Sequence, residues 1–135
     1  MTMFYLKVYL AALVGFLAID GVWLAVIARG FYRDQLGFLL REQPNWWAAG
    51  AFYLLFVAGL LVFAVLPGLQ AGSVWRALLL GAFFGLVTYA TYDLTNLATV
   101  KGWPWIVSVV DMVWGALLAA SVCGIGYAAG RWLRG

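Results

Sequence analysis

The chain has 135 residues, of which 67% are hydrophobic and 10% charged, and its formal net charge is +3. Soluble domains carry about 25% charged residues, so this composition excludes a soluble globular protein and indicates one that lies almost entirely in lipid. The basic residues stand at the ends of the apolar stretches, where a membrane surface accounts for them, and no nucleic-acid partner is implied.

Four apolar stretches divide the chain, and each is close to the about 20 residues that a helix needs to cross a bilayer. They cover residues 4–28, 46–66, 76–98 and 104–128. Spanning strands would be shorter and would alternate in polarity, which these stretches do not. We therefore predict an all-α fold, a bundle of four transmembrane helices that forms one integral membrane domain over residues 1–135.

The first stretch contains an acid in the pattern Asp20-Gly-Val-Trp23. A charged side chain at the centre of a bilayer costs about 2.5–3.5 kcal/mol on insertion scales, so such an acid marks a functional site or a structural pairing. The stretch is longer than the core of a cleaved signal peptide and runs into Arg29 rather than a small-residue cleavage site. We expect it to remain as the first helix.

The segment 29–43 connects the first two stretches and alternates charged residues with apolar ones such as Phe31 and Leu36. This pattern predicts a short amphipathic helix in the membrane interface, or a lid over the end of the bundle. Asn45 is suited to cap the second helix. The pair Pro67-Gly68 is expected to end that helix.

The third stretch carries the second acid within Tyr92-Asp93-Leu94-Thr95-Asn96. Residues three or four apart share one face of a helix. That spacing predicts one stripe of small and polar side chains along this helix, formed by Gly81, Gly85, Tyr89, Asp93 and Asn96. The pair Gly81-x-x-x-Gly85 favours the close approach of another helix.

The fourth stretch contains the third acid and repeats the first pattern as Asp111-Met-Val-Trp114. Ser108, Asp111 and Gly115 fall on one face of this helix. The first and fourth helices run in opposite directions, so an inverted repeat is conceivable, although four residues are a weak indication. Gly102-Trp-Pro104 forms the turn into the helix.

Four spans place both chain termini on one side of the membrane, which we call side B, and the connections at 29–45 and 99–103 on side A. By their positions in the spans, all three aspartates lie in the half of the membrane next to side A. We predict a polar pocket that opens to side A. Its expected residues are Asp20, Asp93, Asp111, Asn96, Tyr89, Tyr92, Trp23 and Trp114, with Arg29, Arg33 and Lys101 as possible charge partners.

A structural interpretation of the acids stands beside this one, since paired buried ionisable residues can serve to hold a bundle together. The chain has no histidine and one cysteine, Cys123. It therefore lacks the usual metal and haem ligands and any nucleophile–base pair, and we expect no catalytic residue, metal or cofactor.

Basic residues are almost equally numerous on the two sides, so the orientation in the membrane is weakly specified. The N-terminal amine adds to side B, and we expect both termini in the cytoplasm.

Three segments carry a resemblance to a known family. They are FYRDQLG at 31–37, Ile19-Asp20-Gly-Val-Trp23, and TYATYDLTNLAT at 88–99 followed by Lys101-Gly-Trp-Pro104. The chain resembles a family of small bacterial integral membrane proteins with four helices and no assigned function. The resemblance implies a multi-pass protein of the bacterial inner membrane, and it implies no active residues.

Three functions fit these observations. The first is the binding or transport of a small apolar or cationic molecule through the polar pocket, with proton coupling as an option. The second is an accessory subunit of a larger membrane complex, or a homodimer, held by packing and lipid contacts. The third is an intramembrane enzyme acting on a lipid or isoprenoid with Asp93 and Asp111 as acid and base, which the missing histidine and nucleophile disfavour.

Overall fold

The computed structural model describes all residues from Met1 to Gly135 and contains helices and connections but no strand. The elements in chain order are α1 (Thr2–Val22), the π-helical segment η1 (Trp23–Ile27), α2 (Arg29–Leu36), α3 (Trp46–Leu60), the π-helical segment η2 (Leu61–Val65), α4 (Leu66–Ala71), α5 (Val74–Thr99) and α6 (Trp105–Arg134).

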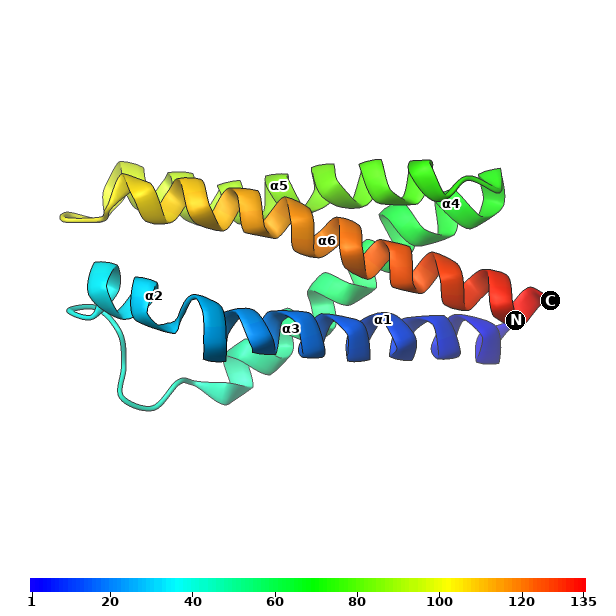
Figure 1. The fold of residues 1–135 in the computed structure, drawn as a ribbon, viewed down its shortest axis with the longest axis horizontal. Coiled ribbons are helices and arrows are strands. Elements are labelled where there is room, and N and C mark those ends of the chain that lie inside the picture. The colour runs from blue at the N-terminus through cyan, green and yellow to red at the C-terminus, as the bar shows by residue number, and fades with distance from the viewer.

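Four continuous helical stretches are long and apolar enough to cross a membrane. They are Thr2–Ile27, Trp46–Ala71, Val74–Thr99 and Trp105–Arg134. The predicted all-α bundle of four transmembrane helices is confirmed. The first span is one residue longer than expected, and the other three are three to five residues longer. Both termini lie at one end of the bundle, whereas α2 and the α5–α6 connection lie at the other (Figure 1).

The second span contradicts the expectation that Pro67-Gly68 would end it. The helix continues to Ala71 and ends at Gly72, whose φ of 64° is the left-handed conformation that favours glycine. Within a helix, the proline ring clashes with the carbonyl group of the residue four positions earlier. Here the preceding η2 segment is wider, because the Leu66 N–H donates to the carbonyl of Leu61, five residues back. Such a π turn accommodates the proline without ending the span.

The second span also crosses the bundle obliquely (Figure 1). Its first part, α3, packs on α1, whereas η2 and α4 pack on α5. The helix therefore begins beside α1 at side A and reaches α5 only towards side B. At side A this leaves α3 and α5 apart, and the site described below opens between them.

Glycines bring α5 and α6 into close contact. A Cβ atom on Gly85 would lie 2.2 Å from the carbonyl oxygen of Gly115, and one on Gly81 would lie 2.6 Å from the Cys123 sulfur. Neither distance is possible for a real side chain, so the predicted glycine pair serves to pack these two helices of one chain. The same contact brings the polar stripes of α5 and α6 face to face.

The connection between the first two spans is helical over a shorter range than the predicted 29–43. Helix α2 ends at Leu36, residues 37–39 form a turn, and residues 40–45 are irregular. Leu36 is buried and Phe31 half-buried, as an amphipathic helix against the bundle requires, while Phe38 is exposed. Asn45 caps α3 as predicted, because its side-chain oxygen accepts from the Ala48 N–H at 3.2 Å.

Candidate functional site

A chain of hydrogen bonds connects α2 to the membrane-spanning bundle. The Tyr32 hydroxyl donates to Oδ1 of Asp111 on α6. The indole Nε1 of Trp23 donates to the Tyr32 oxygen at 3.2 Å. Burial and the bond to Asp111 raise the pKa of Tyr32 well above its usual value, so this phenol remains a neutral donor at physiological pH.

The two Asp-x-Val-Trp patterns meet in the middle of the site and exchange partners. The rings of Trp23 and Trp114 stack with centroids 4.3 Å apart and planes 10° from parallel. Trp114 donates a hydrogen bond of 3.1 Å to Oδ1 of Asp20, a residue of the other pattern. Trp23 reaches the other pattern's Asp111 through Tyr32. The repeated patterns therefore tie the first and last spans together.

Asp93 is fully buried between α5 and α6, and neither of its carboxyl oxygens has a hydrogen-bond partner. The carboxyl group of Asp111 on α6 is its acidic neighbour. Two adjacent carboxylates repel each other, whereas a pair that shares one proton is held by a hydrogen bond. The contact is therefore favourable when one proton lies between Asp93 and Asp111.

The backbone behind Asp93 is fixed by the start of α6. The Ser108 hydroxyl donates to the Asp93 carbonyl oxygen at 2.7 Å. Trp103 Nε1 in turn donates to the Ser108 oxygen at 3.1 Å. The Tyr92 ring meets Trp103 edge to face, with centroids 5.7 Å apart. These contacts hold α5 and α6 in register where the two acids meet.

Two adjoining hollows open on this group of side chains. The aromatic hollow has a volume of about 400 Å³ and lies in the gap between α3 and α5; it is lined by Phe52, Thr88, Tyr89, Tyr92 and Asp111. The arginine hollow has a volume of about 430 Å³ and lies beside α2; it is lined by Leu24, Arg29, Tyr32, Arg33, Leu36, Leu40, Tyr89, Tyr92 and Asp111. Tyr89, Tyr92 and Asp111 form the wall that the two hollows share.

A larger groove of about 550 Å³ follows the outer faces of α5 and α6. Its lining is apolar apart from Ser108 and contains no acid. This groove therefore lacks the acids and tyrosines that gather at the two hollows.

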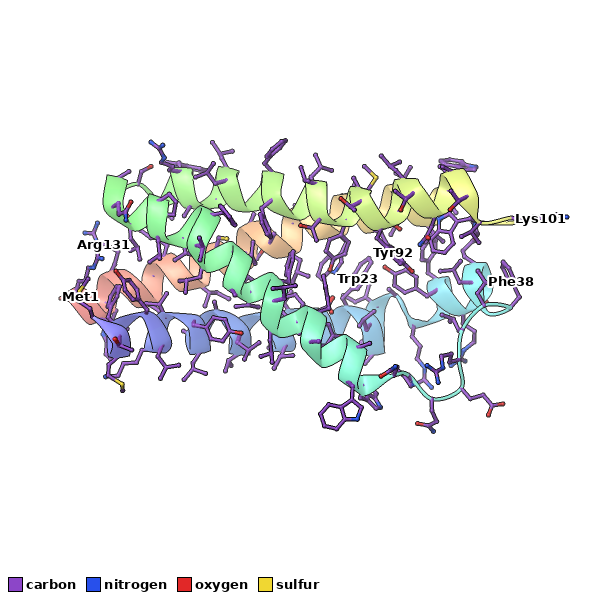
Figure 2. The ribbon with its side chains drawn as sticks, turned by 180° about the vertical axis from the view of Figure 1, so that it is seen from behind. Met1, Trp23, Phe38, Tyr92, Lys101 and Arg131 are labelled. Carbon is purple, nitrogen blue, oxygen red and sulfur yellow. The ribbon has the colours of Figure 1, made fainter.

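The structure brings together most of the side chains expected in the pocket. Asp20, Asp93, Asp111, Trp23, Trp114, Tyr89 and Tyr92 belong to the hydrogen-bonded group or to the hollows. Figure 2 shows Trp23 and Tyr92 in the half of the molecule that carries Phe38 and Lys101, away from Met1 and Arg131. This half faces side A, as the sequence predicts.

The other four expected residues lie outside the hydrogen-bonded group. Arg29 and Arg33 line the arginine hollow together with Asp111. Asn96 is half-buried and lines neither hollow. Lys101 is exposed at the tip of the α5–α6 connection and also lines neither (Figure 2).

Tyr32 is the central residue that the sequence analysis missed. A signal for it exists, because Tyr32 stands four residues before the buried Leu36 and so shares the inner face of α2. A hydroxyl on the apolar face of an interfacial helix needs a partner from the bundle. Phe52 on α3 and Thr88 on α5 were missed as well, since only the oblique path of α3 shows which residues of the two helices line the hollow between them.

These features define a multi-pass membrane protein of four helices with a polar group of side chains between them. Residues 5–128 match the model of the family described as "Predicted membrane protein (DUF2177)", and the chain belongs to this family. The family has no known function. No curated protein and no solved structure matches the chain.

Proposed function

We propose that the protein binds a small cation with apolar substituents in the aromatic hollow. The observation that carries the proposal is the position of Asp111, an acid on the wall of a hollow whose other lining residues are Phe52, Thr88, Tyr89 and Tyr92. Aromatic faces attract cations, and an acid within the membrane supplies the opposite charge at low dielectric. A concave, mostly apolar site with few polar groups is typical of small-ligand binding.

We further propose that binding is linked to a proton. A cation next to Asp111 favours the fully ionised acid pair, so its arrival releases the proton shared with Asp93. Several other titratable or charged groups face the pair. They are Tyr89 and Tyr92 on α5, Tyr32 on α2, Asp20 on α1, and Arg29 and Arg33 at the arginine hollow. Asp20 is already bonded to Trp114, which leaves the Asp93–Asp111 pair as the group that exchanges a proton.

Binding of tetraphenylphosphonium to the detergent-solubilised protein tests this function. Calorimetry should show binding that weakens as the pH falls, because the proton competes with the cation. Asp111→Asn should weaken binding about tenfold or more, which corresponds to about 1.4 kcal/mol or more. Asp34→Asn is the matched control, since Asp34 is exposed on α2 and should leave binding unchanged. Equal affinity in wild type and Asp111→Asn at all pH values would contradict the proposal.

We propose transport in addition to binding, because a proton and a cation that exclude each other at one site can be exchanged across a membrane. On the resemblance and the charge distribution, we also place the chain in the bacterial inner membrane as one domain over residues 1–135, with both termini in the cytoplasm.

A further inference from the structure

The arginine hollow differs in charge from the aromatic hollow beside it. Arg29 and Arg33 are four residues apart, so they lie one turn apart on the same side of α2. Both side chains are exposed, and both line the hollow. Like charges at this spacing repel each other, and an anion placed between them removes that repulsion.

The two arginines follow directly after the first membrane-spanning stretch. That stretch ends at Ile27, two residues before Arg29, and basic residues just beyond a span lie near the lipid headgroups. An anion at this level is available from the bilayer itself.

The remaining lining of the hollow is apolar on one side. Leu24, Leu36 and Leu40 form that part, and Leu24 belongs to the membrane-spanning η1 segment. The hollow thus combines two guanidinium groups at the interface with an aliphatic wall that leads into the membrane. A molecule with an anionic head and an acyl chain has the matching shape.

We propose that the arginine hollow holds the phosphate group of an anionic phospholipid. Arg29 and Arg33 bind the phosphate oxygens, for which the planar guanidinium with its paired N–H donors is well suited. The acyl chain packs on the leucines. The bound lipid fixes α2 against the bundle and so keeps Tyr32 on Asp111. This site differs from the cation site in the charge that it binds, and the arginines and leucines that form it line only the arginine hollow, although Tyr89, Tyr92 and Asp111 form a wall common to both hollows.

Native mass spectrometry after extraction from bilayers of equal parts phosphatidylglycerol and phosphatidylcholine tests the site. The wild-type protein should retain phosphatidylglycerol preferentially. The double variant Arg29→Gln/Arg33→Gln should lose this preference. The control Arg41→Gln/Lys101→Gln removes the same charge from exposed residues that do not line the hollow and should keep the preference.

Further variants keep the result clear if the double variant folds poorly. Arg33→Lys retains the charge but not the forked donors, and it should reduce the preference for phosphatidylglycerol. Phe52→Ala, at a residue that lines the aromatic hollow and not the arginine hollow, should weaken cation binding yet keep the lipid, which separates this inference from the proposed function. Equal retention of both lipids by the wild type, or an equal loss in the control, would overturn the lipid site. Inorganic phosphate that displaces phosphatidylglycerol at equal concentration would overturn the lipid as the source of the phosphate.

Discussion

At the scale of single residues, the main feature is a pair of neighbouring acids between the helices. No group donates a hydrogen bond to the carboxyl oxygens of the buried Asp93, whereas Asp111 accepts one from Tyr32. An unpaired buried carboxylate is costly, since it loses its hydration without a replacement. A shared proton removes most of that cost, and the stability of the fold then depends on pH.

Replacement of Asp93 should reveal that dependence. In the wild type, the folded state holds the shared proton more tightly than the unfolded state does. Raising the pH removes that proton, so the melting temperature should fall as the pH rises. Asp93→Asn supplies a permanent donor to Asp111, so its melting temperature should change little with pH. Asp93→Ala leaves a gap and should cost about 1–3 kcal/mol. Thermal shift in detergent between mildly acidic and mildly basic pH measures all three. Identical pH profiles in wild type and Asp93→Asn would exclude a shared proton.

Loss of the Tyr32 hydroxyl should weaken the attachment of α2. Tyr32→Phe removes the donor to Asp111 and the acceptor for Trp23, so two partly buried groups lose their partner. Unfolding free energy should fall by about 1–3 kcal/mol. Tyr5→Phe, at an exposed tyrosine, is the control and should have little effect. Equal melting temperatures for the two variants would show that the Tyr32 bonds do not stabilise the fold.

At the scale of helices, the site depends on one close contact and one separation. The glycines let α5 and α6 touch, which brings Asp93 next to Asp111. The oblique second span keeps α3 away from α5 at side A, which opens the aromatic hollow.

A methyl group at the close contact should force the two helices apart. In Gly85→Ala the new Cβ would lie 2.2 Å from the backbone oxygen of Gly115, which cannot rotate away. Overpacking of this kind costs about 1–3 kcal/mol. Gly50→Ala in α3 has no atom within 4 Å and should be neutral or slightly stabilising. Melting temperatures of the two variants in detergent test the contact, and equal values would show that α5 and α6 do not approach so closely.

Local chemistry made several of these elements predictable. Asn45 caps α3 because its side chain bonds a neighbouring N–H, an interaction that the sequence contains in full. The end of the second span was not predictable in this way, since η2 absorbs Pro67 through a wider turn that packing against α5 and α6 supports. The range of α2 was overestimated because the apolar residues after Gly37 remain exposed.

At the scale of the whole molecule, the depth of the three acids was predictable from the sequence, and the partners of each acid were not. Counting residues along each span placed the three acids in the same half of the bilayer. Sequence spacing does not show which acid meets which donor. The exchange of partners between Asp20, Trp114 and Trp23 depends on how α1 and α6 are rotated against each other, as does the contact of Asp111 with Asp93.

The arrangement of four spans predicts which residues are reached from the same side of the membrane. Single cysteines at Thr2 and Gly135, in a Cys123→Ala background, should react with an impermeant maleimide from one side, and a cysteine at Lys101 from the other. On the proposed orientation, the termini react from the cytoplasmic side. Labelling of intact cells and of inverted vesicles measures this. Reaction of Thr2 and Lys101 from the same side would contradict the four-span topology.

The central claim is that Asp93 and Asp111 share a proton at the wall of the aromatic hollow. Infrared spectroscopy of the purified protein at neutral pH measures this directly, through the C=O stretching band of a protonated carboxyl group. The account predicts such a band in the wild type, its persistence in Asp20→Asn, and its loss in Asp93→Asn and in Asp111→Asn. Absence of the band in the wild type, or its persistence in Asp93→Asn, would contradict the account.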